Sequence, residues 1–109
     1  MNAPAPSPLT HVVYHILLAL TGDPRHGYGI IKDVATDTDG AVEIEAGTLY
    51  AAIKRLRDDG WIAEVAAPAG ADARRRYYTI TAEGRRVLEA ESMRLAGMVE
   101  LARRARILS

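Results

Sequence analysis

The sequence contains no cysteine among its 109 residues, which excludes a disulfide framework and a thiolate metal site. A chain without cysteine fits a reducing compartment, and we expect a cytoplasmic protein. A long hydrophobic run is also lacking: the longest, Ile16 to Leu20, is far shorter than the roughly 20 residues of a membrane span. The first ten residues, MNAPAPSPLT, include three prolines and no basic residue, so they do not resemble a signal peptide. We expect residues 1–8 to form a flexible arm and the protein to have no membrane partner.

The chain has no net charge either, because 14 basic residues balance 14 acidic ones. This balance counts against a simple nucleic-acid-binding protein, which usually carries an excess of positive charge. The charges are unevenly distributed, however. Residues 22–45 have two basic and six acidic residues, whereas residues 46–80 have six basic and four acidic ones. Only charges within about 10 Å of a phosphate act on it strongly at 0.1 M salt, so a neutral chain can still present a basic edge.

The sequence lacks the patterns that mark an active site. It has no acid, histidine and nucleophile in a catalytic order, and no glycine-rich phosphate loop after a strand. We therefore expect neither an enzyme nor a bound cofactor. His11 and His15 have the spacing of two metal ligands on one helix, but no third ligand stands nearby in the sequence. We expect no metal site and keep a metal-responsive regulator as an alternative.

Apolar residues at intervals of three and four predict four helices. The first starts after Ser7 as N-cap, with Pro8 in the first position, and ends before Gly22. The second covers about 27–36 and the third about 46–59, with Leu49, Ala52, Ile53 and Leu56 on one buried face. The last runs from about 82 to 107 after Thr81 as N-cap, and would be near 40 Å long. Such a length exceeds what so small a domain can cover, so we expect part of this helix to contact a second chain.

Two segments rich in aromatic and β-branched residues, 61–65 and 74–80, predict a β-hairpin with a mobile AAPAGADA tip. Strand alternation would place Arg74 and Arg76 on one side and Arg75 on the other. Residues 42–44 alternate as well and suggest a very short strand. The order of elements predicts a mainly α fold with a small β-hairpin: a winged helix-turn-helix domain over residues 9–80, followed by a long dimerisation helix over residues 81–109.

The polar side of the third helix and the hairpin carry the candidate DNA-binding residues. Tyr50 is a large aromatic residue on a polar face, and Lys54 lies one turn further on. A helix that enters the major groove would present such side chains to bases and phosphates. The wing, which is the predicted hairpin, would bind the DNA phosphate backbone through arginines. The candidates are Tyr28, Thr48, Tyr50, Lys54, Arg74 and Arg75. The alternative is an ordinary solvated face and a charged edge strand, with Tyr28 in the core.

Three segments then resemble a known family: HGYGI (26–30), GTLYAAIKRLRDDGWI (47–62) and RRRYYTITAEGRRVL (74–88). In order and separation they are similar to the PadR family of bacterial winged-helix transcription regulators, and the similarity extends from about Leu9 to Arg104. The resemblance implies a homodimer that binds double-stranded operator DNA, usually as a repressor that an effector releases. It places the recognition helix at 46–59 and the wing at 61–80.

The sequence departs from the family at the entry to the recognition helix. Family members commonly have Ser-Pro or Thr-Pro before the GTLY segment, whereas this chain has Glu45 and Ala46. The usual cap and its proline are missing, and a carboxylate stands at an end expected to face phosphate.

For the dimer interface we predict a stripe of apolar residues on the first and last helices: Val12, Ile16, Leu88, Leu95, Met98, Val99 and Ala102. Part of this stripe, Leu88, Leu95, Met98 and Val99, could line a pocket for an apolar small-molecule effector between the subunits, and the alternative is a plain interface. The alternative from another functional class is a winged helix that has lost DNA binding and docks a protein partner through its long helix.

Overall fold

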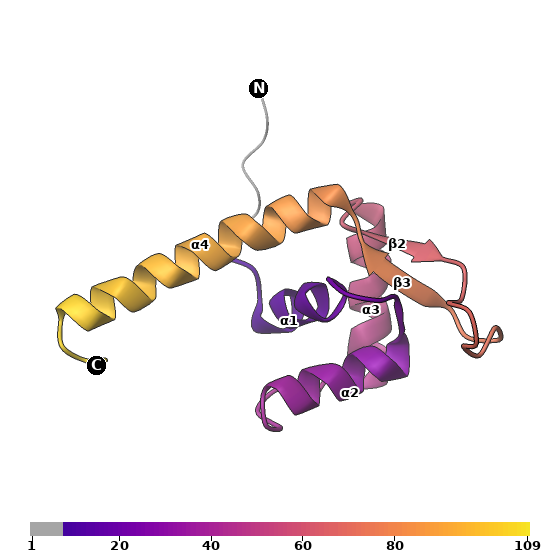
Figure 1. The fold of residues 1–109 in the computed structure, drawn as a ribbon, viewed down its shortest axis with the longest axis horizontal. Helices are drawn as coiled ribbons and strands as arrows, with labels where there is room; N and C mark the ends of the chain where they lie inside the picture. The colour runs from indigo at the N-terminus through magenta and orange to yellow at the C-terminus, as the bar shows by residue number, and fades with distance from the viewer. Residues whose placement is uncertain (1–7) are drawn as a thin grey trace.

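The computed structural model describes residues 8–109, which form four helices and a small sheet (Figure 1). In chain order the elements are α1 (His11–Ala19), β1 (Arg25–His26), α2 (Gly27–Asp37), α3 (Ala46–Asp58), β2 (Ile62–Val65), β3 (Tyr77–Ile80) and α4 (Ala82–Arg104). The predicted fold class is confirmed: the chain is mainly helical, with a small antiparallel sheet and a long C-terminal helix. Within residues 8–109, no helix combines the length and apolar character that a membrane span requires.

Helix α1 begins later than the sequence suggested. Its N-cap is Thr10, whose hydroxyl accepts a hydrogen bond of 3.1 Å from the N–H of Val13. The prediction that Pro8 occupies the first helical position is therefore wrong: the cap is Thr10 and the first helical residue is His11. The predicted cap Ser7, like most of the predicted arm, lies outside the described residues.

The buried face of α3 agrees with the prediction. Leu49, Ile53 and Leu56 are 0%, 3% and 2% exposed, and Ala52 packs against the same core. The residue at the N-cap position is Glu45, and its side chain makes no capping hydrogen bond. Helix α3 therefore lacks the side-chain cap that α1 has.

The sheet has three strands in the order β1-β3-β2, all antiparallel. Strand β3 pairs with β2 through Ile80 opposite Ile62, and with β1 through Tyr78 opposite Arg25. The sequence did not predict β1, and the strand suggested for residues 42–44 does not form. Ile44 is instead buried within a loop.

Strand β3 is also shorter than predicted, since it begins at Tyr77. The three arginines that precede it, Arg74 to Arg76, lie in the loop between β2 and β3. The expected alternation of their side chains across a strand is therefore wrong: the loop, and not the pleat of a strand, sets their directions.

The core lies where α1, α2, α3, the sheet and the first half of α4 meet. It consists of Ile16, Leu17, Leu20, Ile30, Val34, Ile44, Leu49, Ile53, Leu56, Trp61, Ile62, Tyr78, Ile80, Val87 and Leu88. In the first turn of α4, a Cβ atom on Gly84 would overlap with the carbonyl oxygen of Trp61, so the glycine permits a close approach. Thr81 caps this helix by accepting from the N–H of Gly84 at 3.0 Å, as predicted.

A buried carboxylate joins α4 to the start of the described chain. Glu91 is 4% exposed, accepts the N–H of Leu9 at 3.0 Å, and accepts two hydrogen bonds of 2.8 Å from Arg94. The hydrogen bonds from Arg94 satisfy a charge that would be costly to bury alone. Beyond this point α4 extends away from the domain to the C-terminal end (Figure 1).

Candidate nucleic-acid interface

A recess lies between the start of α2, the exposed side of α3 and the loop that precedes β3. Its volume is about 350 Å³, and its lining consists of His26, Gly27, Tyr28, Tyr50, Arg74, Arg75, Arg76 and Tyr78. Four of the six candidate DNA-binding residues therefore line one surface, although they come from three separate segments of the chain. We refer to this surface as the wing recess.

Tyr50 spans the gap between α3 and α2. Tyr50 is 54% exposed, and its hydroxyl lies against Gly27, the first residue of α2. A Cβ atom on Gly27 would lie 2.6 Å from the Tyr50 hydroxyl oxygen, which is too close for a real contact. The glycine thus lets the phenol reach the N-terminal end of α2, an end that favours negative charge.

Tyr28 lies on the surface of the wing recess and not in the core, because it is 57% exposed. The Lys32 ammonium lies 5.5 Å from its ring centroid, and the Arg75 guanidinium 6.0 Å from it. Both distances lie within the range of cation–π attraction. The aromatic ring therefore holds two cations near the mouth of the wing recess.

His26 connects the wing to α2. Its Nδ1 accepts a 3.0 Å hydrogen bond from the N–H of Gly29, as the N-cap of α2, and lies 3.2 Å from Nη1 of Arg75. Both neighbours donate, so the ring is neutral with its proton on Nε2. Burial lowers the pKa of His26, and the neighbouring Arg75 lowers this pKa further.

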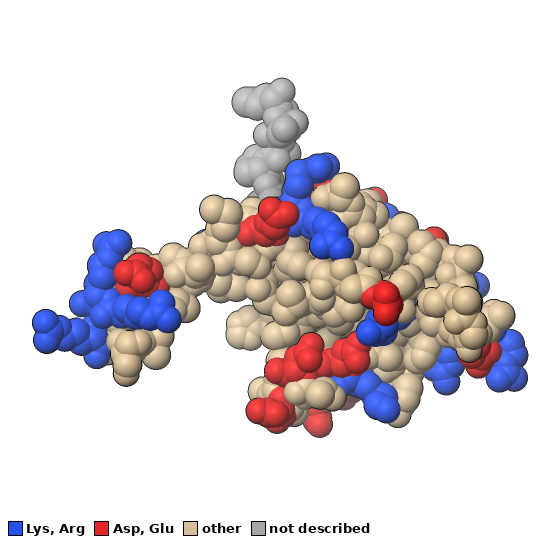
Figure 2. All heavy atoms as spheres, in the orientation of Figure 1, with Lys and Arg blue, Asp and Glu red and all other residues tan. Residues whose placement is uncertain are grey.

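The arginines of the loop are paired with shared carboxylates. Arg74 lies 3.1 Å and Arg75 3.8 Å from Asp72, and hydrogen bonds from Arg74 lower the pKa of this carboxyl. Arg76 shares Glu64 with Arg57 of α3, at 3.9 Å and 3.6 Å. Four guanidinium groups thus share two carboxylates, which leaves an excess of positive charge. Figure 2 shows basic atoms at the far end of the loop between β2 and β3.

The remaining two candidates lie outside the wing recess. Lys54 extends from the exposed face of α3, with 79% of its side chain exposed, and pairs with Asp58 at 2.9 Å. Thr48 lies on the other edge of α3 and lines a different pocket. Sequence reasoning did not select His26 as a site residue, although its place before Gly27 in HGYG fits an N-cap.

The residues predicted for a dimer interface divide into two groups. Met98 and Val99 are 54% and 39% exposed, and Val12, Leu95 and Ala102 are half-buried. Ile16 and Leu88 are 0% and 6% exposed, because the core of the single chain covers them. They have no surface to offer to a second chain, so we remove these two from the predicted interface.

The two histidines of α1 do not form part of a metal-binding cluster within residues 8–109, since no three histidine, cysteine, aspartate or glutamate residues gather there. His11 is exposed. The ring centroid of His15 lies 5.7 Å from that of Tyr14, in an edge-to-face arrangement.

Comparison with known proteins identifies the family. The model of the "Transcriptional regulator PadR-like family" matches residues 16–90, which include the wing recess and most of the core. The chain belongs to this PadR-like family. Family members are transcriptional regulators and not enzymes, as the sequence predicted.

Solved structures of other bacterial proteins share the fold of this PadR-like chain. A transcriptional regulator from Clostridium thermocellum is 28% identical, with a TM-score of 0.71 over 86% of this chain and 88% of that one. A PadR family regulator from Eggerthella lenta is 30% identical, with a TM-score of 0.68 over 90% and 83%. Bacillus subtilis PadR in complex with operator DNA is 24% identical, with a TM-score of 0.61 over 72% of this chain and 45% of that one.

Proposed function

We propose that this PadR-like regulator is a homodimeric repressor that binds a palindromic operator through α3 and the loop between β2 and β3. The observation that carries the proposal is the wing recess, where Tyr28, Tyr50, Arg74 and Arg75 converge from three segments. The fold is shared with a PadR protein that was solved with operator DNA, which supports DNA as the partner.

In the proposed complex, α3 enters the major groove with Tyr50 and Lys54 facing the DNA. Its buried face stays on the core through Leu49 and Ile53, so the helix is rigidly supported. The ammonium of Lys54 reaches a guanine or a phosphate once it leaves Asp58. This exchange costs little, because an exposed ion pair contributes only about 0–1 kcal/mol.

The loop arginines bind the sugar-phosphate backbone. Arg74 has 91% of its side chain exposed, and Arg75 is held near the Tyr28 ring. A phosphate oxygen accepts the same guanidinium hydrogen bonds that Asp72 accepts in the free protein. Because such contacts recognise charge and not base identity, the loop contributes affinity for all sequences.

The test is a gel shift with the DNA upstream of the gene that encodes the chain. Combined Tyr50→Ala and Lys54→Ala substitutions are expected to abolish the specific shift, whereas Arg103→Ala, a cation near the end of α4, leaves it unchanged. Combined Arg74→Ala and Arg75→Ala substitutions weaken binding to every sequence and reduce the slope of log K against log salt by about 2. If the combined Tyr50→Ala and Lys54→Ala substitutions leave the specific shift unchanged, α3 is not the recognition helix.

We further propose that an effector releases the operator by changing the geometry of the dimer. Two α3 helices related by a two-fold axis fit half-sites about one helical turn of DNA apart. An effector that changes the angle between the α4 helices of the dimer alters this spacing, and a modest difference in affinity between the two arrangements shifts the population.

A second candidate function is a protein-docking module that has lost DNA binding. Two observations favour it: each loop arginine is paired with a carboxylate, and Glu45 adds negative charge at the start of α3. A salt-dependent gel shift distinguishes the two candidates, since a docking module produces none.

A further inference from the structure

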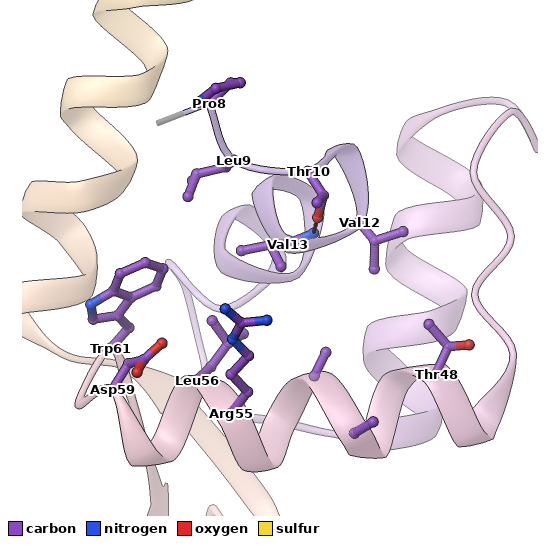
Figure 3. A pocket seen from close by; sticks show the side chains of 12 residues that line it. Pro8, Leu9, Thr10, Val12, Val13, Thr48, Arg55, Leu56, Asp59 and Trp61 are labelled. Carbon is purple, nitrogen blue, oxygen red and sulfur yellow. Dashed lines mark hydrogen bonds between the residues drawn. The ribbon is translucent and has the colours of Figure 1, made fainter. Parts of the chain in front are cut away.

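A second pocket lies between α1 and α3, on the edge of α3 away from the wing recess (Figure 3). Leu9, Val12 and Val13 cover it from the side of α1, and Leu56 and Trp61 lie on the opposite wall. Its volume is about 530 Å³, which is within the usual range for a small-molecule site. We refer to it as the α1–α3 pocket.

One cation points into this apolar pocket. Arg55 extends from α3 towards α1, beside Leu56 and below Val13 (Figure 3). Of the other two basic residues of α3, Lys54 pairs with Asp58 and Arg57 pairs with Glu64. Across the part of the chain that the structure describes, Arg55 has neither an ion pair nor a side-chain hydrogen bond.

The pocket also contains one carboxylate, Asp59, four residues after Arg55. This spacing often allows an ion pair on a helix, yet the two side chains are not within ion-pair distance here. Asp59 therefore does not neutralise Arg55, although its carboxylate would compete with an anionic ligand for the guanidinium. A guanidinium beside apolar surface is weakly hydrated and forms strong charge-assisted hydrogen bonds with an anion.

We propose that the α1–α3 pocket binds an apolar monoanion. The anionic group pairs with Arg55, and the hydrocarbon body lies against Leu9, Val13 and Trp61. A neutral molecule of the same shape binds less well, because it leaves the guanidinium without a partner. A second cation would be repelled by Arg55.

The proposed ligand would contact α3, the proposed recognition helix, directly. This part of the inference rests on the proposed function. Arg55 and Thr48 lie on the same edge of α3. The anionic group of a bound ligand neutralises the positive charge of Arg55 on this helix and so weakens the attraction of α3 for DNA phosphates. By linkage, operator DNA and ligand then weaken each other's binding by the same factor.

A pair of fluorescent dyes tests the pocket without DNA. The apolar anion 1-anilinonaphthalene-8-sulfonate and its uncharged analogue N-phenyl-1-naphthylamine share nearly the same hydrocarbon body. We expect saturable binding of the sulfonate to the full chain, about tenfold tighter than binding of the neutral dye, since one charge-assisted hydrogen bond is worth about that factor.

Two substitutions with opposite expected effects on sulfonate affinity locate the anionic group of the bound dye. Arg55→Gln is expected to lower sulfonate affinity about tenfold and leave the neutral dye unchanged. Asp59→Asn removes the competing carboxylate and is expected to raise sulfonate affinity several-fold. Arg57→Gln, on the other side of α3, and Arg103→Gln, beside the exposed apolar residues of α4, are matched controls that leave both dyes unaffected. Each variant changes an exposed side chain, and circular dichroism verifies its fold.

Three results would overturn the proposal. The first is no saturable binding of the sulfonate, and the second is an equal loss of affinity for both dyes in Arg55→Gln. The third is a loss of sulfonate affinity in Arg103→Gln and not in Arg55→Gln. Displacement of the dye as protein concentration rises through dimerisation would also overturn it, because a second copy of the chain would then occupy the pocket. Dye binding that meets the expectations while the operator gel shift fails supports the pocket and contradicts only the proposed DNA-binding function.

Discussion

Two glycines set how closely neighbouring segments approach in this chain. Gly27 gives room to the Tyr50 hydroxyl, which is the end of a side chain that can move. Gly84 gives room to the carbonyl oxygen of Trp61, which belongs to the main chain and is held by a 3.0 Å hydrogen bond from the N–H of Thr81. A substitution at Gly84 must therefore displace the main chain, whereas one at Gly27 meets only side chains, the phenol of Tyr50 and a methyl group of Leu49.

We expect Gly84→Ala to lower the free energy of unfolding by about 1–3 kcal/mol, the usual cost of forcing extra volume into a packed site. Urea-induced unfolding measures the effect. Gly97→Ala in the same helix is the matched control, since a Cβ atom there meets nothing within 4 Å. Alanine has the higher helix propensity, so this control raises the free energy of unfolding by roughly 0.5–1 kcal/mol. Equal effects of the two substitutions would contradict the proposed overlap.

His26 is expected to make stability depend on pH. Burial and Arg75 lower its folded pKa below 6.5, with Arg25 acting in the same direction and Asp72 and Asp33 against it. The unfolded chain then binds more protons than the folded chain as pH falls below 6.5. The stabilising contribution of neutral His26 is therefore full above pH 6.5 and is lost as pH falls through the lowered folded pKa.

Unfolding measured at a series of pH values tests this linkage. In His26→Asn the asparagine side chain still accepts from the N–H of Gly29 but does not titrate, so the loss of stability just below pH 6.5 is expected to be smaller. An identical pH profile for the two proteins would show that His26 does not contribute.

At the scale of elements, the helices differ in how their first turns are capped. Thr10, His26 and Thr81 each accept a main-chain N–H at the start of α1, α2 and α4. Glu45 at the start of α3 does not. The helix proposed to enter DNA is therefore the one whose first N–H groups are left without a side-chain acceptor, and these groups are free to meet a phosphate.

We expect Glu45→Asp to raise the free energy of unfolding by about 0.5–1 kcal/mol, because aspartate keeps the charge and is a good N-cap. Thermal unfolding measures the change. Thr10→Ala, which removes an existing cap, is expected to lower stability by about 1 kcal/mol. A neutral result for Glu45→Asp would indicate that the first turn of α3 cannot present its N–H groups to an aspartate side chain.

The helices could be predicted from sequence because each has a clear apolar period and a core to face. Strand β1 could not, since two residues, Arg25 and His26, show no alternation and acquire strand geometry only by pairing with β3. The strand predicted for residues 74–80 was too long at its start for the opposite reason. Arg74 to Arg76 adjoin two tyrosines and share their strand-like context, but have no partner strand in the structure.

The candidate site could be predicted residue by residue but not in its arrangement. Tyr50 and the loop arginines were selected by type and position. That Tyr28 meets Arg75, or that Arg55 alone among its neighbours stays unpaired, depends on distances between segments far apart in the sequence. Sequence periodicity reports which side of a helix is buried, and not which neighbour each exposed side chain meets.

At the scale of the whole molecule, the second half of α4 is largely exposed. Met98, Val99 and Leu101 are 54%, 39% and 59% exposed, and this half extends away from the domain (Figure 1). Leu95, Met98, Val99 and Ala102 lie on one side of the helix, at the spacing of an interface stripe. We expect a second copy of the chain to cover this stripe.

Met98→Glu is expected to raise the dimer dissociation constant about 10- to 100-fold, since the substitution would bury a charged carboxylate in an apolar interface. Sedimentation equilibrium measures it. Met93→Glu is the matched control: Met93 is 75% exposed and lies five residues earlier, about 140° around the helix from Met98. Equal weakening by both substitutions would contradict the predicted stripe.

Helix α3 separates two surfaces of different chemistry. On one edge Tyr50 borders the wing recess, and on the other Arg55 borders the α1–α3 pocket. The two sets of lining residues have no member in common. A substitution that alters one edge therefore leaves the side chains of the other in place. After a gene duplication, one copy of such a regulator can acquire a new chemical signal while it keeps the operator of its ancestor.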